Sequence, residues 1–598
     1  MNINMWTPRA LHQPLSCLAL TTLILLSNVA QAADQRPNIV LLLADDWGFS
    51  DVGAFGSEIA TPNLDALAAL GTRFTNFHVA ASCAPTRSML MTGVDSHLNG
   101  LGNMPETIPL PHKGQPGYEG ELNDRVVTVA SLLRDSGYHT YISGKWHLGH
   151  EPQNLPPSRG FEHSLIQADS GSDNWEMRPY LMLKPQVAWY EEGSPLTSLP
   201  TDYYSSTFFV NKAIEHIESN RGSQQPFFSY IAFQANHIPL QAPQAFIDKY
   251  RGQYAEGWHA LRQQRRLRAI ELGLIPKGSS MVEMDTTRSW DALSETEQAY
   301  QARRMEVYAG MADAMDHEVG RLIEYLRETD QYDNTVFVFL SDNGAEASDP
   351  YSMLSGRLWL DWQYDRSLER LGSKGAYAIL GPSWASAAAS PLSTYKFYAG
   401  EGGLRVPLII AGVTNSLTNQ IQHSFAHVTD LAPTLLDLAG LQLQTGQYQD
   451  RMVEPMTGRS LLSVMTGQAS ITHPPEHPIG YELSGNAALF KGDYKLVKNI
   501  PPVGDGRWRL FDIRQDPGEV HDLQEQMPKR FIAMQTDYAS YVRANGVLTM
   551  PTNYDPMSQI QINAFINVFL PTLIKVTLLL SALLIGGLWY RRYRRRKP

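Results

Sequence analysis

Short runs of consecutive apolar residues recur between residue 37 and about residue 411, and longer segments with helical periodicity separate them. The runs cover residues 38–44, 138–143, 227–233, 335–340 and 406–411. Runs of this kind are typical of strands buried on both faces of a parallel sheet. Helices are predicted between them, for example at Val126–Ser136 and Tyr300–Thr329. This alternation predicts an α/β domain with helices on both faces of the sheet.

The pattern changes after about residue 458. Residues 488–498 and 507–513 alternate apolar and polar side chains, and Gly492-Asp493 divides the first segment. This predicts a small antiparallel sheet in a second unit that ends near Val547. Before it, residues 250–300 are polar and charged, which indicates an insertion over the main sheet. Residues 350–395 are rich in Gly, Ser and Ala, and we expect a long loop near the functional site there.

The two ends of the chain predict export and anchoring. Residues 1–32 combine Arg9, an apolar run at 15–29 and Ala30-Gln31-Ala32, which is the pattern of a cleaved signal peptide. A buried first helix explains the A-Q-A sequence less well. The expected domains are then 33–457 for the α/β unit and 458–547 for the small sheet.

The C-terminal residues predict a membrane anchor. A linker at 548–564 leads into an apolar segment at 565–590, long enough to cross a bilayer, and then a basic tail at 591–598. An interfacial helix is the weaker alternative, because the segment has no polar face. The positive-inside rule keeps the tail in the cytoplasm, so we expect the rest of the protein in the periplasm, held at the bacterial inner membrane.

Charge and cysteine usage narrow the functional classes. The net charge is −11, and only 262–268 and the C-terminus are locally basic, which argues against a nucleic-acid partner. Removal of the signal peptide takes Cys17 with it, so Cys83 becomes the only cysteine and an intramolecular disulfide is excluded. Cys83 is then either a reactive thiol or an ordinary buried side chain.

Oxygen-bearing side chains follow two of the apolar runs. Asp45 and Asp46 come after one run, and Asp342 and Asn343 after another. Ligands of open α/β sheets bind beyond the carboxyl ends of the strands. Each Asp alone is well explained as a helix cap. The two pairs together favour a hard cation, Ca²⁺ or Mg²⁺, over zinc.

Cationic side chains are expected at the same edge. Lys145 and His147 follow the run at 138–143 and share one face if the chain stays extended, and His237 follows the run at 227–233. Pro85 suits the first turn of a helix, which puts Cys83 at a helix N-terminus and Arg87 one turn later. A nucleophile placed there suits attack on a sulfate or phosphate group.

Several motifs resemble those of the sulfatase family, with bacterial arylsulfatases the closest match. C-A-P-T-R-S-M-L-M-T-G at 83–93 and G-K-W-H-L-G at 144–149 match the two family signatures. The resemblance extends over about residues 36–545 through further matching segments, at 257–262, 315–320, 341–346, 401–407, 430–440 and 510–519. It implies an alkaline-phosphatase-like fold with a large mixed sheet, flanking helices and a smaller C-terminal antiparallel sheet.

The resemblance also implies a role for each matched residue. Cys83 would be oxidised to formylglycine by a maturation enzyme, either an oxygen-using or a radical type, and the aldehyde hydrate would attack sulfur. The formylglycine would also bind Ca²⁺ together with Asp45, Asp46, Asp342 and Asn343, with Mg²⁺ the less favoured ion. Arg87 and Lys145 would hold the hydrate, and His147 would take the proton from its second hydroxyl. His237 would protonate the leaving alcohol, and Lys396 would bind the sulfate.

Three alternatives stay open from the sequence. Lys374 is a second candidate for the sulfate-binding lysine, although Lys396 lies closer to the E-G-G-L-R-V-P motif. A phosphonate monoester or phosphodiester hydrolase of the same superfamily is the nearest functional rival. A tethered protein that binds sulfated ligands without cleaving them is a more distant one, because a binder needs neither the precursor cysteine nor His147.

Overall fold

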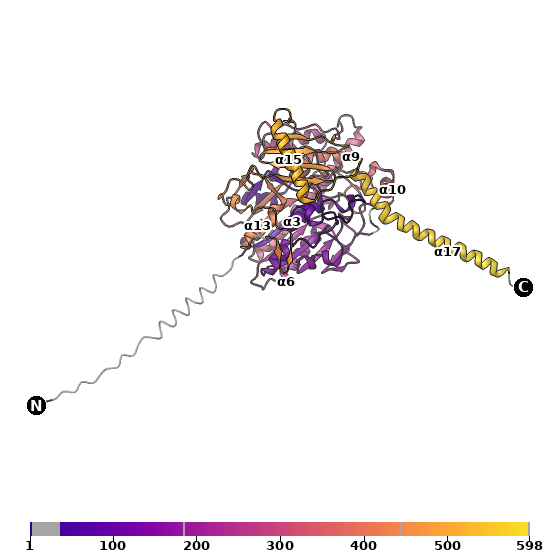
Figure 1. Cartoon of the computed structure of the whole chain (residues 1–598), viewed down its shortest axis with the longest axis horizontal. Coiled ribbons are helices and arrows are strands. Elements are labelled where there is room, and N and C mark those ends of the chain that lie inside the picture. Colours follow the sequence, from indigo (N-terminus) through magenta and orange to yellow (C-terminus); the bar gives the residue numbers. More distant parts are fainter. Residues whose placement is uncertain (3–35, 183, 185, 443–444, 596–598) are drawn as a thin grey trace.

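A ten-stranded mixed sheet forms the centre of the protein in the computed structural model, which describes residues 1–2, 36–182, 184, 186–442 and 445–595 (Figure 1). In spatial order the strands are β11 (Gln420–Gln422), β2 (Thr72–Phe74), β10 (Leu408–Ala411), β9 (Thr335–Ser341), β1 (Asn38–Ala44), β8 (Phe227–Ala232), β4 (His139–Lys145), β5 (His163–Gln167), β6 (Trp189–Glu191) and β7 (Ser194–Pro195).

The middle of the sheet is parallel, as the apolar runs predicted. β1 pairs in parallel with β9 on one side and β8 on the other, and all its residues are buried. The run at 406–411 differs, because β10 pairs antiparallel with β9. An apolar run shows that a strand is buried on both faces but carries no information about its direction.

Helices cover both faces of the sheet and form two separate cores with it. Val40 and Leu42 of β1 pack into one core with α2 (Pro62–Leu70), α6 (Ser205–Ser219), α8 (Gly257–Glu271) and α9 (Glu295–Glu328). Ile39 and Leu41 pack into the other with α3 (Cys83–Thr92), α5 (Val129–Asp135) and α13 (Leu431–Leu438). Successive side chains of a strand point to opposite faces, so one strand serves both cores.

The prediction of a long loop at 350–395 is wrong for much of that segment. This segment contains α10 (Leu354–Gln363) and α11 (Gly381–Ala388). Nearly every residue of α11 is buried, including Trp384, which packs edge-on against Trp258 of α8. A helix buried on all sides lacks the one-sided apolar stripe by which an amphipathic helix is recognised, and this explains the error.

The small antiparallel sheet is present and packs close to the first turn of α3. It consists of β15 (Ile479–Leu483), β16 (Asn486–Lys491), β17 (Tyr494–Lys498) and β18 (Arg509–Asp512), with α15 (Pro528–Asn545) against it. The hydroxyl of Tyr481 accepts a hydrogen bond from the backbone N–H of Ala81 at 3.0 Å. His97 lies 3.0 Å from Glu482 and joins the two units a second time.

The C-terminus forms one long helix that projects from the body (Figure 1). It comprises α16 (Pro556–Ala564), a π-helical turn at Phe565–Phe569 and α17 (Leu570–Arg594), and it is long and apolar enough to cross a membrane. Part of the expected linker is therefore helical. The signal peptide predicted at 1–32 lies almost entirely outside the described residues.

Candidate active site

The polar side chains that follow β1 and β9 meet at one edge of the sheet. The two strands are paired in register, so Asp45 and Asp46 lie beside Asp342 and Asn343. The backbone N–H of Asp46 lies 3.3 Å from Oδ1 of Asp342, and Nδ2 of Asn343 donates to Oδ1 of Asp46 at 2.6 Å. All four residues are buried. The sheet therefore brings together the oxygen-bearing residues predicted at its edge.

These residues form a set of donors that fits a hard cation. Oxygen or sulfur atoms of Asp45, Asp46, Cys83 and Asp342 all lie within 4.8 Å of one another. Oδ2 of Asp46 and Oδ1 of Asn343 are buried and have no hydrogen-bond partner among the described residues. Buried polar atoms rarely stay unpaired. Carboxylate and amide oxygens suit Ca²⁺ or Mg²⁺ better than softer metals.

The three buried carboxylates of the site differ in the direction of their pKa shifts. Burial and the charge of Asp342 raise the pKa of Asp45, and burial raises that of Asp46 well above its ordinary value. Burial alone would raise the pKa of Asp342 too, but the adjacent Arg87 holds it below its usual value. A divalent cation among these carboxylates would stabilise their charged forms.

Three buried cations surround the carboxylates. The guanidinium of Arg87 contacts Oδ2 of Asp342 at 2.7 Å and 2.9 Å, and Nζ of Lys145 lies 2.5 Å from Oδ2 of Asp45. Nζ of Lys396 lies 2.7 Å from Oδ1 of Asp46. An arrangement of cations around one point suits an anionic substrate.

The geometry separates the two candidate lysines. Lys396 is buried among the strand-end residues, whereas Lys374 is half exposed and lies 3.4 Å from Glu176 at the surface. The preference for Lys396 thus has a geometric basis, because Lys396 and not Lys374 places its ammonium group at the cluster of carboxylates.

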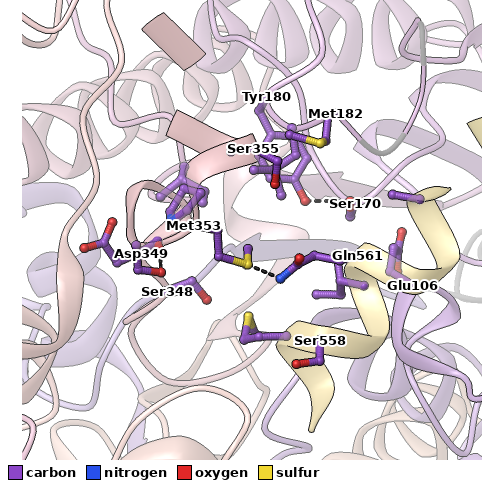
Figure 2. A pocket seen from close by; sticks show the side chains of 18 of the residues that line it. Glu106, Ser170, Tyr180, Met182, Ser348, Asp349, Met353, Ser355, Ser558 and Gln561 are labelled. Carbon is purple, nitrogen blue, oxygen red and sulfur yellow. Dashed lines mark hydrogen bonds between the residues drawn. The ribbon is translucent and has the colours of Figure 1, made fainter. Parts of the chain in front are cut away.

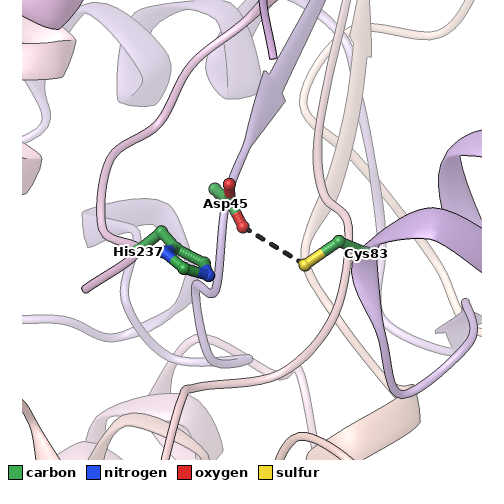
Figure 3. Close-up of side chains that lie close together, drawn as sticks. All are labelled: Asp45, Cys83 and His237. Atoms are coloured by element: carbon green, nitrogen blue, oxygen red, sulfur yellow. Dashed lines mark hydrogen bonds between the residues drawn. The ribbon is translucent and has the colours of Figure 1, made fainter. Parts of the chain in front are cut away.

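Cys83 is the first residue of α3 and faces the carboxylates. Its Sγ lies 3.6 Å from Oδ1 of Asp45, and the ring of His237 stands on the other side of that carboxylate (Figure 3). Burial raises the pKa of the Cys83 thiol well above its ordinary value, and the charge of Asp342 adds to the effect. The thiol is therefore held protonated, which makes it a poor nucleophile.

His237 is buried next to the same cluster. Its Nδ1 lies 2.7 Å from the carbonyl oxygen of Ile238, which assigns the proton to Nδ1 and leaves Nε2 as the acceptor, 3.9 Å from Oδ2 of Asp46. Burial, followed by the charges of Lys145 and Lys396, lowers the pKa of His237 well below its ordinary value. The ring is thus held in its neutral form.

His147 does not continue the extended strand, contrary to the expectation that it shares a face with Lys145. Its φ is +57°, so the backbone turns sharply after β4. Its Nε2 lies 3.3 Å from Oε1 of Glu106, while Nδ1 is buried without a partner among the described residues. Burial would raise the pKa of Glu106, but His147 lowers it to about 2. The ionised Glu106 leaves Nδ1 of His147 as the basic nitrogen.

The comparisons with known proteins agree with this geometry. The family model described as Sulfatase matches residues 37–441. An arylsulfatase of Klebsiella aerogenes is 36% identical over 452 residues, which cover 75% of this chain and 96% of the relative. This chain belongs to the sulfatase family. An uncharacterized sulfatase of Schizosaccharomyces pombe is 39% identical, with coverage of 88% and 96%. As a family member, the chain is a sulfuric ester hydrolase.

Solved structures share the fold of this sulfatase. The structure of Ps i-CgsB in complex with k-i-k-neocarrahexaose aligns with a TM-score of 0.61 at 23% identity, covering 89% of this chain and 98% of that one. The alkaline-phosphatase-like architecture, with its large mixed sheet and smaller antiparallel sheet, is therefore confirmed.

Two acidic residues of the sulfatase site were missed in the sequence. Glu346 is buried, and one of its carboxylate oxygens lies 2.7 Å from Nζ of Lys396. It belongs to the S-D-N-G-A-E motif, so the motif could have identified it as a site residue. Glu106 comes from a short 3₁₀ turn at Pro105–Thr107 that carries no recognisable pattern. Only its position beside His147 in space identifies it.

A large cavity leads away from the sulfatase site. Its volume is about 1450 Å³, and Cys83, His237 and Lys396 line it. Other walls come from α10 and from the C-terminal helix; Figure 2 shows Ser558 and Gln561 of α16 opposite Met353 and Glu106.

Proposed function

We propose that this sulfatase hydrolyses sulfate monoesters of the arylsulfatase type, using formylglycine made from Cys83 and a bound Ca²⁺. The observation that carries the proposal is the position of Cys83: a buried side chain, 3.6 Å from a carboxylate and surrounded by the cations of the site, whose thiol pKa is raised by burial. A thiol in this state serves poorly as a nucleophile, which favours its role as a precursor. An aldehyde hydrate at this position supplies one hydroxyl to attack sulfur and a second that lets sulfate leave.

The cation site is proposed for Ca²⁺, with Mg²⁺ the less favoured ion. Asp45, Asp46, Asp342 and Asn343 would hold it together with residue 83, and the unpaired oxygens of Asp46 and Asn343 support this assignment. The cation would supply positive charge that offsets the negative charge of the sulfate group.

Arg87, Lys145 and Lys396 are proposed to hold and neutralise the substrate anion. Each is buried and already lies at the carboxylates of the site, at distances of 2.5–2.7 Å. Fixed positive charges in a site that excludes water stabilise charge that develops in the transition state. Nζ of Lys396, held from one side by Glu346, is the proposed contact to sulfate.

The two histidines are proposed to move protons. Nδ1 of His147, the ring nitrogen that does not contact Glu106, would take a proton from the group at position 83. Nε2 of His237 would deliver a proton to the leaving oxygen. A bound sulfate ester raises the pKa of His237 through its negative charge and offsets the effect of burial.

Aryl specificity rests on two observations. The relative from Klebsiella aerogenes is named an arylsulfatase, and the cavity next to the site has an apolar wall that includes Tyr180, Leu181 and Ile238. Aromatic groups bind well in such pockets. We place the enzyme in the periplasm, anchored by the C-terminal helix and matured by a formylglycine-forming enzyme.

Mass spectrometry of the peptide that contains Cys83, taken from the native host, tests the central step. We expect an aldehyde in place of the thiol. The purified protein is then assayed on 4-nitrophenyl sulfate and 4-nitrophenyl phosphate, and sulfate should be strongly preferred. An intact thiol in active protein overturns the formylglycine assignment, and a preference for phosphate overturns the reaction assigned.

A further inference from the structure

The cavity connects the catalytic residues with the C-terminal helix. Cys83 and Lys396 line one part, while Phe565, Phe569 and Leu573 of the C-terminal helix line another. The last three are exposed side chains on the segment that is apolar enough to cross a membrane. The cavity therefore opens beside the start of the membrane-spanning segment.

A second apolar surface borders the same opening. α10 exposes Leu354, Leu358 and Trp362, which are 70%, 61% and 79% exposed. They are spaced four residues apart and so form a stripe along one face of the helix. The opposite face holds Leu360 in the protein interior, and Trp359 lines the cavity. Large exposed apolar residues gathered on one helix indicate an interaction surface.

α10 and the C-terminal helix are neighbours. The side chain of Gln561 in α16 contacts Met353, which directly precedes α10 (Figure 2). Asn563 donates hydrogen bonds to the carbonyl oxygens of Glu106 and Ile108 at 2.9 Å and 3.1 Å. These hydrogen bonds connect α16 to the turn that contains Glu106, which contacts His147. They therefore fix the position of the opening relative to the catalytic residues.

We propose that the stripe on α10 lies in the surface of the bilayer that the C-terminal helix crosses, and that the substrate is a sulfate ester of a membrane-resident amphiphile. The inference rests on the proposed sulfatase function and anchor. The bilayer is chosen as the occupant because α10 and the segment that is apolar enough to cross a membrane line the same cavity, and because Trp is favoured at membrane interfaces.

The chemistry of the cavity agrees with such a substrate. The cationic part receives the sulfate, and the apolar side chains of Leu181, Met182 and Ile238 also line the cavity. An apolar group can therefore extend from the sulfate toward the bilayer without facing water. Each CH₂ that stays out of water favours binding.

The position of α10 is tested on the full-length chain in phosphatidylcholine vesicles. Leu358→Cys carries an environment-sensitive fluorophore, and Ile532→Cys on α15, also an exposed position (62%), is the matched control. Quencher attached to lipid tails should reduce the emission at position 358 and leave position 532 unchanged. If an aqueous quencher reaches position 358 fully, or if a second copy of the chain protects it without lipid, the inference is overturned.

The substrate class is tested by kinetics in the same vesicles. 4-Nitrophenyl sulfate is compared with an aryl sulfate that carries a dodecyl chain, and kcat/KM should favour the alkylated ester by at least about tenfold. Replacing Leu354, Leu358 and Trp362 with Ser should remove most of this preference without changing activity on the soluble ester. The double variant Leu267→Ser, Ile532→Ser is the control for exposed apolar side chains elsewhere.

The two proposals fail in different ways. A chain that hydrolyses neither ester, despite an aldehyde at position 83, overturns the proposed function. A chain that hydrolyses the soluble ester but shows no preference for the alkylated one, or keeps that preference in the triple variant, overturns the membrane inference alone.

Discussion

Nζ of Lys396 lies 2.7 Å from Oδ1 of Asp46, and both side chains are buried. Lys396 comes from a loop after α11 and Asp46 from the end of β1, so the pair joins two distant parts of the chain at the site. Burial opposes the charge of Lys396, but Asp46 raises its pKa well above the ordinary value, so the ammonium stays charged.

Lys396→Met should reduce kcat/KM for aryl sulfates by about 10²–10³, because a fixed charge at the sulfate is lost. Lys374→Met removes an ammonium group from the surface and should leave the rate unchanged. Steady-state assays of the two variants decide between the lysines. Equal effects, or a larger loss in the Lys374 variant, would contradict the assignment.

Glu106→Gln should reduce activity about tenfold and shift the pH profile. Burial lowers the pKa of His147 and the ionised carboxylate of Glu106 partly offsets this, so neutralising Glu106 lowers the pKa of His147 further. A base with a lower pKa stays unprotonated at lower pH, and the acidic limb of kcat/KM should move to more acidic pH. Glu121→Gln, at a site outside the cavity lining, is the control. If the acidic limb of kcat/KM does not move, Glu106 has no part in the proton transfer.

Chelation of divalent metal should abolish activity and lower the melting temperature. Asp45 and Asp46 would then lie buried with raised pKa values and no cation between them. Ca²⁺ should restore both properties better than Zn²⁺, because the donors are oxygens. Activity that is indifferent to chelation, measured after metal analysis of the sample, would exclude the proposed cation site.

The pH dependence of stability should depend on His97. Burial lowers its pKa, but hydrogen bonds to Asp95 and Glu482 raise it to about 9. Because the folded-state pKa lies above the unfolded value, the stabilisation is complete below about pH 6.5 and is lost as pH rises through about 9, up to about 3 kcal/mol. His97→Gln should flatten this decline in denaturant titrations between pH 6 and 9.5. A parallel decline in both proteins would contradict the assignment.

Truncation after Ala564 should release a soluble enzyme. The shortened chain keeps α16, with the hydrogen bonds of Asn563 to the turn that carries Glu106, but loses the apolar helix. Activity on soluble aryl sulfates should be retained, as measured in the supernatant after ultracentrifugation. A truncated protein that stays in the membrane fraction as firmly as the full chain would show that α17 is not the anchor.

The sequence predicted the parts of the fold and site that depend on local pattern. The continuous apolar runs identified β1 and β9, and Asp45 and Asp342 follow them directly, so strand pairing alone brings these residues together. The length and apolar composition of the C-terminal segment likewise predicted its helix. Such features follow from burial and strand geometry, which act over a few residues.

Other features depend on contacts that local pattern does not contain. The backbone turn at His147 and its contact with Glu106 arise from packing between separate segments. The burial of α11 removed the amphipathic signal on which helix prediction rests. The role of α16 in lining the cavity was hidden because its sequence reads as a polar linker.

The hydrogen bond between Ala81 and Tyr481 has a consequence for the timing of biosynthesis. The two residues are separated by 400 positions, so the segment that carries Cys83 lacks this partner until most of the chain has been made. At about 5–20 residues per second, synthesis of that length takes about 20–80 s. An enzyme that modifies Cys83, as we propose, would act within an interval set by translation, and faster elongation would then lower the fraction of protein that is converted.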